Sequence, residues 1–499
     1  MAFSGWSNSL RQLVPLVMIG GALWAQSAGA DGWPVAHGNP ANTSYQNVLT
    51  APAVSPIRVM SDLGTFADGI SPIVSAEGNV FLGDREGNVI ALRADGTRWW
   101  NHQLGSGWSV RSTPAVNSRG ELFVLASRIV NDHRGTVETK RIESLLLGFA
   151  DGGALLFQVP LPARGLGGIS TAPLNIVRDP ANAEVVVFPM RYAFSQGYYH
   201  ELWLLAYNRF GVVEAEVKVG AEHGTIGSAS SLDWGHDFSI ASPDDPNAPE
   251  EYQSPLLGAA VPHGNGLDSS VVVVNDDMGS VARYRFSGRF AQGFTEIDRW
   301  KQGEKYPAIS APVVANNGVV LFNRPGDVLI LQNDGTSVRR KVHYESDAPP
   351  AVLPNGRIIH TSQGGLEEAG GAPGPENTRS YVSPTASRNY LYASENYRLA
   401  TFRIEDLALV ATYDLEYGGR QQPAIGPLGH VYALTFNKLH IFPPNPSVAT
   451  GTNIGPGGVA GATTAPGGSE GSSTSKPPRV GTFNPAILTQ PGFTPVPGN

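Results

Sequence analysis

The chain of 499 residues contains 59 glycines and 39 prolines, and only 16% of its residues are charged. Glycine and proline interrupt helices and supply turns, so this composition favours many short strands over long helices. The 35 Lys and Arg residues against 43 Asp and Glu residues give a net charge of −8, which disfavours binding to the phosphates of a nucleic acid. The absence of cysteine excludes disulfides, thiolate metal sites, cysteine nucleophiles and a lipid-bearing N-terminal cysteine.

The N-terminal segment has the features of a secretory signal peptide. Arg11 precedes an apolar stretch at residues 13–25, which is too short to span a bilayer comfortably, and Ala28, Gly29 and Ala30 form a small-residue cleavage site. We therefore expect a signal peptide at residues 1–30, a mature chain that begins at Asp31, and a periplasmic or extracellular protein. The alternative is a buried N-terminal helix. No other segment of the sequence predicts a transmembrane span.

A repeat follows, in which a proline begins a short apolar segment and a glycine stands six residues later. The clear copies pair Pro72 with Gly78, Pro114 with Gly120, Pro312 with Gly318, Pro350 with Gly356, and Pro423 with Gly429. Weaker copies begin at Pro173, Pro255 and Pro384. These starts are spaced as the blades of a propeller are, at about 40–50 residues each once insertions are allowed.

Each unit predicts four antiparallel strands, which we name A to D in chain order. In the first unit, strand A follows Pro72, strands B and C lie at residues 80–82 and 89–92, and a turn at Asp95 and Gly96 leads to strand D at residues 99–102. Four strands in each of about eight units predict an all-β, seven- or eight-bladed β-propeller, with eight blades favoured. We expect it to be a monomer.

The ends of the repeat region define the expected domains. The strand predicted at residues 57–60 has no hairpin partner, so we expect it to pair with the last blade at residues 440–442 and to close the ring. Residues 31–56 are then a lead-in, residues 57–442 the propeller, and residues 443–499, which are rich in Gly, Pro, Ser and Thr, a disordered tail. The unit between Pro350 and Pro384 is short enough to lack outer strands.

Residues 89–99 resemble the repeat of the pyrroloquinoline-quinone (PQQ)-like propeller superfamily, in which a strand ending in Ala-Leu precedes a turn and a tryptophan, here Trp99, that docks against the next blade. The segment from Trp33 to Gly38 is similar to the lead-in of that superfamily, and the resemblance covers about residues 33–442. The quinoprotein dehydrogenases of this superfamily commonly carry a vicinal disulfide, which a chain without cysteine cannot form. The chain therefore resembles the non-catalytic scaffolds of the outer-membrane assembly factor B type more than the dehydrogenases.

The long insertions are expected on one face of the propeller. The B–C and D–A connections of all blades lie on one face, here named the connection face, and the A–B and C–D turns lie on the other, the turn face. We interpret residues 127–143, 189–200 and 363–378 as B–C loops, and residues 221–253 as a D–A loop. Loops on a rigid scaffold often carry function, although they can also be tolerated insertions.

Residues that precede the repeated prolines are expected to surround the channel mouth on the connection face. The candidate binding residues are Asp68, Trp108, Arg111, Tyr252, Gln253, Tyr306, Arg379, Tyr381, Arg420 and Gln421, with Tyr198 and Tyr199 from an aromatic loop. Arginines, aromatics and amides suit an anionic or polar ligand. The alternative is that these side chains cap strand ends and bond to neighbouring blades.

Chemistry-bearing motifs are scarce. Asp233, Asp237, Asp244 and Asp245 form a weak candidate for a Ca²⁺ loop, but the spacing of a calcium-binding loop is absent and a solvated acidic loop is the simpler interpretation. We predict no catalytic residue, metal or cofactor. The sequence favours an exported scaffold that binds a protein or another extracytoplasmic macromolecule; the alternative is a degenerate quinoprotein-type oxidoreductase with PQQ and Ca²⁺ at the channel mouth.

Overall fold

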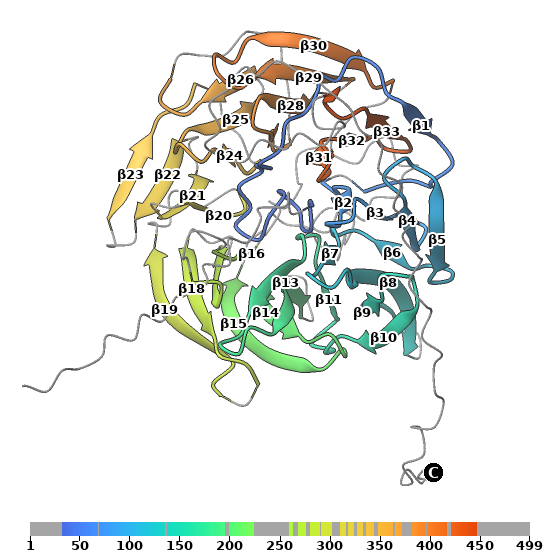
Figure 1. The fold of residues 1–499 in the computed structure, drawn as a ribbon. Coiled ribbons are helices and arrows are strands. Elements are labelled where there is room, and N and C mark those ends of the chain that lie inside the picture. The colour runs from blue at the N-terminus through green and yellow to red at the C-terminus, as the bar shows by residue number, and fades with distance from the viewer. Residues whose placement is uncertain are drawn as a thin grey trace, which may run out of the picture. The chain divides into compact units, whose positions relative to one another are not determined.

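The computed structural model describes residues 32–446 with several gaps. The described ranges are 32–67, 69–134, 137–194, 199–223, 259–262, 268–275, 280–289, 291–301, 310–315, 318–323, 327–332, 336–343, 348–362, 365–371, 382–395, 397–416 and 421–446. The predicted signal peptide and all but the first residues of the predicted tail lie outside these ranges. Within them, eight antiparallel sheets are arranged in a ring (Figure 1), which confirms the all-β propeller with eight blades.

Four blades have the expected four strands in the order A to D. Blade 1 contains β2 (Ile73–Val74), β3 (Val80–Gly83), β4 (Asn88–Leu92) and β5 (Arg98–Gln103). Blade 4 contains β16 (Ala259–Ala260), β17 (Val271–Asn275), β18 (Ser280–Phe286) and β19 (Phe294–Lys301). Blade 5 contains β20 (Val313–Ala315), β21 (Gly318–Asn323), β22 (Asp327–Gln332) and β23 (Ser337–Arg340). Blade 7 contains β27 (Thr385–Ala386), β28 (Tyr390–Ser394), β29 (Arg398–Arg403) and β30 (Leu409–Asp414).

Blades 2 and 3 differ in having two short inner strands each and much longer B and C strands. Blade 2 contains β6 (Ser109–Val110), β7 (Ala115–Val116), β8 (Leu122–Arg134), β9 (Val137–Phe149) and β10 (Leu155–Pro160). Blade 3 contains β11 (Gly168–Ile169), β12 (Asn175–Arg178), β13 (Glu184–Ala193), β14 (Tyr199–Tyr207) and β15 (Val213–His223). In both blades the first short strand pairs with the extended part of strand B.

Blade 6 is the shortest sheet. It contains β24 (Ala351–Val352), β25 (Ile358–Ser362) and β26 (Gly365–Glu368), with no fourth strand among the described residues. The prediction of missing outer strands is confirmed to that extent. The prediction of a B–C loop at residues 363–378 is wrong, because Gly365 to Glu368 pair with β25 as strand C.

Blade 8 closes the ring as predicted. It contains β31 (Ala424–Ile425), β32 (Val431–Leu434), β33 (Leu439–Phe442) and, as its outer strand, β1 (Arg58–Met60). β1 pairs antiparallel with β33, with Arg58 opposite Ile441 and Met60 opposite Leu439. The chain therefore joins its first and last strands in one sheet, and β1 covers the edge of β33 that would otherwise be unpaired.

The repeated glycine has a local cause. Gly78 and Gly120 follow strand A in the A–B turn and have φ values of 87° and 75°. This left-handed region suits a residue without Cβ. Their amides donate to the carbonyls of Ser75 and Asn117, at 2.9 and 3.0 Å, which closes the turn.

The lead-in lies inside the ring, where the inner strands converge (Figure 1), a placement that the sequence alone did not predict. The amide of Trp33 donates to the carbonyl of Val74 in blade 1 at 2.6 Å. Further carbonyls of the segment accept from the inner strands of other blades: Pro34 from Val116, Pro40 from Val261, Ala41 from Val314, Thr43 from Val352, and Ser44 from Ala386. The Asn175 side chain of blade 3 also donates to the Pro40 carbonyl, at 2.8 Å. The lead-in thus connects blades 1 to 7 from within.

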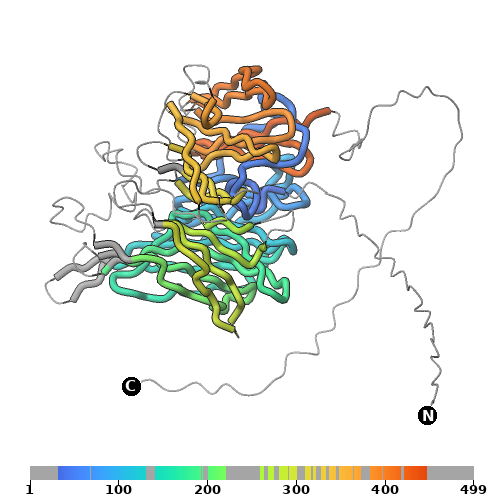
Figure 2. Tube along the Cα trace, turned by 90° about the vertical axis from the view of Figure 1, so that its left-hand side faces the viewer, coloured from blue at the N-terminus to red at the C-terminus, as the bar shows by residue number. Residues whose placement is uncertain are grey.

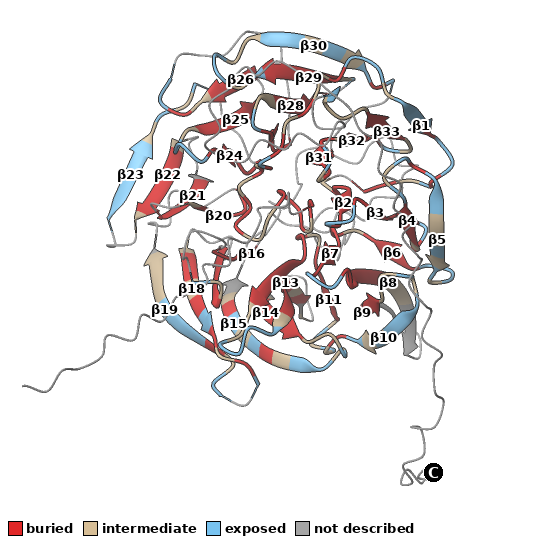
Figure 3. Cartoon of the chain, in the orientation of Figure 1, coloured by how far each residue is buried: buried red, intermediate tan, exposed pale blue. Residues whose placement is uncertain are grey.

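Burial follows the order of strands within each blade. The A, B and C strands are largely buried, while the outer strands β5, β10, β23 and β30 alternate or are exposed (Figure 3). Figure 2 shows the ring from the side. No helix in the described part of the chain has the length and apolarity needed to cross a membrane.

The tryptophan that docks against the next blade is Trp100, and the prediction for Trp99 is wrong. The Trp100 indole stacks on Phe149 of blade 2, with ring centroids 5.5 Å apart, and its Nε1 donates to the Asp151 carbonyl at 3.3 Å. Trp99 instead lies under Arg93 of its own blade, whose Cζ is 3.7 Å from the ring centroid. Ala91 pairs with Trp100 and Leu92 pairs with Arg98, so Trp99 is the extra residue of a β-bulge and Trp100 takes the position that reaches blade 2.

Candidate functional site

Two long hairpins extend the sheets of blades 2 and 3 on the connection face. β8 and β9 pair without interruption from Leu122 opposite Phe149 to Arg134 opposite Val137. β13 and β14 pair from Val186 opposite Tyr207 to Ala193 opposite His200. The segments predicted as B–C loops at residues 127–143 and 189–200 are therefore mostly paired strands, although they lie where B–C connections were expected. The predicted D–A loop at residues 221–253 falls largely outside the described residues.

The inner end of the first hairpin carries a ladder of charged side chains above an indole. Trp108, just before β6, packs in the core and is 9% exposed. The Arg128 guanidinium lies over its ring, with Cζ 4.5 Å from the centroid. Arg128 also bonds to Glu143 on the opposite strand, at 2.8 Å through Nε, and Glu143 pairs with Arg141 at 2.7 Å. Two arginines are thus held at fixed positions on the hairpin.

A second arginine and aromatic cluster continues this surface into blade 3. The connection after β10 runs beside β9, where the Leu166 carbonyl accepts from the Ile142 amide at 2.8 Å. Arg164 in that connection lies over Trp203 of β14, with Cζ 3.6 Å from the ring centroid, and pairs with Glu216 at 2.8 Å. Tyr192 lies on the same guanidinium at 5.5 Å; burial raises the pKa of Tyr192 to about 12, so its phenol is neutral.

These side chains form one surface across blades 2 and 3, which we call the hairpin strip: Trp108, Arg128, Arg141, Glu143, Arg164 and Trp203. Arginine, tryptophan and tyrosine are the residue types that most often dominate protein interfaces. Sequence reasoning missed Arg128 and Arg141 because residues 127–143 were interpreted as a loop, and it made no prediction for Arg164, which lies in the connection between β10 and β11. The signal was present in the alternation of Arg141 and Glu143 with the buried Ile142, which is typical of a strand.

Three predicted channel-mouth residues are described with their side chains. Trp108 belongs to the hairpin strip. Arg111 lies near Arg85, and burial together with that neighbouring charge lowers the pKa of Arg111 to about 10. Gln421 is buried and donates through Nε2 to the Ala67 carbonyl before blade 1, at 3.3 Å. The Gln421 contact matches the alternative interpretation, in which such residues join neighbouring blades.

The structure does not bring the remaining predicted site residues together within its described part. Asp68, Tyr198, Asp233, Asp237, Asp244, Asp245, Tyr252, Gln253, Tyr306, Arg379, Tyr381 and Arg420 lie outside the described residues. Tyr199 is described only as a backbone position in β14, opposite His223. Among the described side chains, no group of three or more His, Asp or Glu residues is placed to hold a metal ion.

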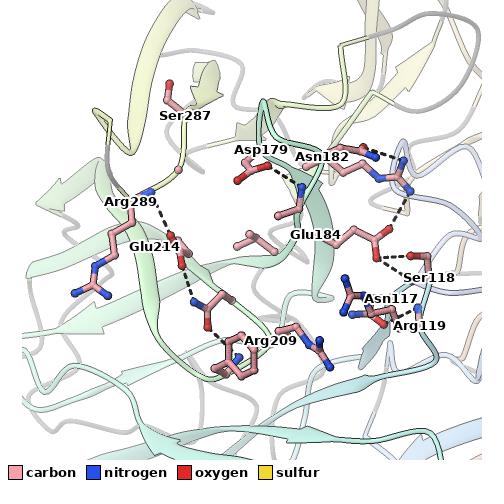
Figure 4. A pocket seen from close by; sticks show the side chains of 16 residues that line it. Asn117, Ser118, Arg119, Asp179, Asn182, Glu184, Arg209, Glu214, Ser287 and Arg289 are labelled. Carbon is pink, nitrogen blue, oxygen red and sulfur yellow. Dashed lines mark hydrogen bonds and ion pairs between the residues drawn. The ribbon is translucent and has the colours of Figure 1, made fainter.

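A cavity of about 540 Å³ lies on the turn face, between blades 2, 3 and 4 (Figure 4). It is bounded by the A–B turns of blades 2 and 3 and by the C–D turns of blades 3 and 4. The cationic residues that line it are Arg119, Arg178, Arg209 and Arg289. Sequence reasoning placed no site here, since turns from three blades meet only once the ring has assembled.

Comparison with known proteins gives a fold likeness only. No protein-family model matches the chain, and no curated protein matches it. Among solved structures, the chain is similar to BamB from Moraxella catarrhalis, at 10% identity with a TM-score of 0.48 over 78% of this chain and 97% of that chain. It is also similar to BBS1N, solved in complex with ARL6DN, at 10% identity with a TM-score of 0.41 over 80% of this chain and 99% of that one. We attach no function to either likeness.

Proposed function

We propose that this chain is an exported, non-catalytic propeller that binds a protein or another extracytoplasmic macromolecule through its connection face. The observation that carries the proposal is the hairpin strip, where arginines and aromatic rings are held in place by strand pairing and by Glu143 and Glu216. Side chains that are already ordered lose less conformational entropy when a partner binds. The strip therefore has both the composition and the preorganisation of a binding surface.

The strip favours a macromolecule over a small substrate because it lies along strands that extend the sheets of two blades and two of its arginines are partly exposed. Its residues come from paired strands and a connection that stand side by side across two blades, whereas small-molecule sites are concave and largely enclosed. Arg141 is 52% exposed and Arg128 is 36% exposed at the side chain. Both guanidinium groups can reach the carboxylates or carbonyl groups of a partner.

The proposal is tested by recovering partners from the native organism with the tagged wild type and with an Arg128→Ala, Arg141→Ala double variant. We expect the partner recovered with the wild type to be lost with the double variant, because central interface arginines commonly contribute about 2 kcal/mol or more to binding. The matched control is Arg403→Ala on the turn face of blade 7, whose side chain is 51% exposed and pairs with Asp406. Recovery that survives the double variant, or that the control abolishes, would contradict the proposal.

Export rests on the sequence of residues 1–30 and has its own test. Secretion with cleavage at the small-residue site would leave Asp31 at the N-terminus of the mature protein. N-terminal sequencing of protein extracted from the native organism should find Asp31. A chain that still begins at Met1 would refute this part of the proposal and leave the binding surface untouched.

A further inference from the structure

Two arginines of the blade 2 hairpin converge on one carboxylate. Arg128 of β8 lies directly opposite Glu143 of β9, and Arg141 stands two residues before Glu143, so the three side chains share one face of the hairpin. Arg128 bonds to Glu143 Oε2 through Nε at 2.8 Å and through a terminal nitrogen at 2.6 Å. Arg141 bonds to Glu143 Oε1 at 2.7 Å. Both oxygens of the carboxylate are therefore engaged by arginine, and we call these three residues the arginine triad.

The charges of the arginine triad do not balance. Two guanidinium groups share one carboxylate, which leaves one positive charge in excess. The neighbouring pairs toward blade 3 are matched one to one, since Arg164 pairs with Glu216 and Lys218 pairs with Glu201. Among these described ion pairs of blades 2 and 3, the excess positive charge thus lies in the arginine triad.

The arginines of the triad are more accessible than its carboxylate. The Arg141 and Arg128 side chains are 52% and 36% exposed, whereas Glu143 is 27% exposed. Trp108 holds Arg128 from the side of the core, with Cζ 4.5 Å from the ring centroid. A guanidinium has five N–H donors and no acceptor. An incoming group therefore meets donors that are fixed in position, and more of the guanidinium groups than of the carboxylate.

We propose that the partner of the connection face presents an acidic protein segment, one carboxylate of which bridges Arg128 and Arg141; this inference rests on the proposed function. Glu143 already demonstrates that a carboxylate fits between the two guanidinium groups, whose forks match carboxylate oxygens. The partner's carboxylate binds the remaining donors or takes the place of Glu143. An excess of one positive charge suits a singly charged carboxylate better than a phosphate, which carries nearly two charges. Because the whole chain has a net charge of −8, an acidic segment has to be held by this local excess.

The test measures the fluorescence polarisation of a labelled octaglutamate peptide with the purified protein. We expect octaglutamate to bind and octaglutamine, its neutral analogue, not to bind. The Arg128→Ala, Arg141→Ala double variant should weaken the binding at least tenfold, because the charge-assisted bonds to both guanidinium groups are lost. The Arg128→Lys, Arg141→Lys variant should keep part of the affinity through its charge. Arg403→Ala on the turn face is the control and should bind as the wild type does.

Glu143→Gln gives a prediction in the opposite direction. The variant removes the carboxylate that occupies both arginines and raises the local charge by one, while the amide keeps the length of the side chain. Octaglutamate should therefore bind several-fold more tightly than it binds to the wild type. If Glu143 served only to hold the hairpin together, the variant would bind more weakly. All variants should melt close to the wild type, because exposed ion pairs contribute little to stability.

Three results would overturn the proposal: no binding of octaglutamate to the wild type, equal binding to the double variant, or weaker binding to Glu143→Gln. Tighter binding of heparin, a sulfated polysaccharide, would overturn the choice of a protein segment. If octaglutamate does not bind but partner recovery is still lost in the double variant, the proposed function stands and the acidic segment is rejected. If octaglutamate binds but partner recovery survives in the double variant, the partner binds elsewhere and both proposals are rejected.

Discussion

The centre of the ring and the hairpin strip are both rich in contacts, but the contacts are of different kinds. In the centre, the lead-in makes backbone hydrogen bonds to the inner strands of successive blades, and none of its residues 32–46 is exposed. In the hairpin strip, the contacts are ion pairs and cation–π pairs between side chains that remain partly exposed. Buried contacts of the first kind hold a fold together, whereas exposed pairs of the second kind commonly contribute about 1 kcal/mol or less.

Within one domain, the centre of the ring therefore stabilises the fold, whereas the hairpin strip is available to bind a partner. A substitution in the centre affects the blades that the lead-in joins, because a buried backbone group that loses its partner has no water to bond to instead. The strip can exchange its internal pairs for pairs with a partner at little cost to the fold.

The largest effect is expected at Trp33. Its side chain is fully buried, its backbone exchanges two hydrogen bonds with Val74, and its ring lies against Gly38, where an added Cβ would come within 2.7 Å. Trp33→Ala should lower the free energy of unfolding by about 3–5 kcal/mol, because it leaves a cavity where the lead-in meets blade 1. Urea denaturation measures this loss. A change below about 1 kcal/mol would show that the lead-in does not support the ring.

The next effect is a dependence on pH at His37, which lies buried in the lead-in. Burial lowers the pKa of His37 from 6.5 to about 4, with Gln422 acting weakly in the opposite direction. Between these values the unfolded chain binds a proton that the folded chain does not, so stability is greatest above about pH 6.5 and falls as the pH drops toward 4. The full shift corresponds to about 3 kcal/mol.

His37→Asn should flatten part of this pH dependence, and its backbone fits because Asn tolerates the φ of 60° found at this position. The pH dependence of stability that remains is expected to come from His360 and His440, because burial also lowers their pKa values to about 4. Urea midpoints measured from pH 4.5 to 7.5 provide the comparison. An identical slope in the wild type and the variant would contradict a neutral, buried His37.

The smallest effect on stability is expected in the hairpin strip. Arg164→Ala removes the cation–π contacts with Trp203 and Tyr192 and one ion pair with Glu216, whose side chain is 39% exposed. The free energy of unfolding should fall by about 1 kcal/mol or less, while partner recovery should fall strongly. A loss of stability as large as that of Trp33→Ala would place Arg164 among the residues that hold the fold.

The repeat made the fold predictable, but the sites depend on assembly. The proline and glycine spacing, the Asp-Gly turn and the unpartnered strand at residues 57–60 each describe a local unit, so blade number and ring closure could be inferred from them. The position of the lead-in inside the ring could not be inferred, since the carbonyl groups of Pro34 to Ser44 meet their partners only in a closed ring. Arg119 and Arg289 are far apart in sequence and line one cavity only because blades 2 to 4 stand side by side.

Long insertions gave the least reliable interpretations. Residues 127–143 and 363–378 were both expected to be loops, yet both contain paired strands. In residues 127–143 the alternation of Arg141, Ile142 and Glu143 indicated a strand, whereas Gly365–Glu368 is too short and too polar to show a strand pattern. The prediction that residues 127–143 lie on the connection face was nevertheless correct, because strand order alone decides on which face a B–C connection lies.

The central claim, that the connection face binds the partner, is tested most directly by crosslinking in the native organism. A photoreactive amino acid is placed at Arg141 on the hairpin strip or at Arg403 on the turn face, two positions whose side chains are about equally exposed, at 52% and 51%. We predict a specific adduct from position 141 and none from position 403. An adduct from position 403 alone would contradict it, because the partner would then contact the opposite face.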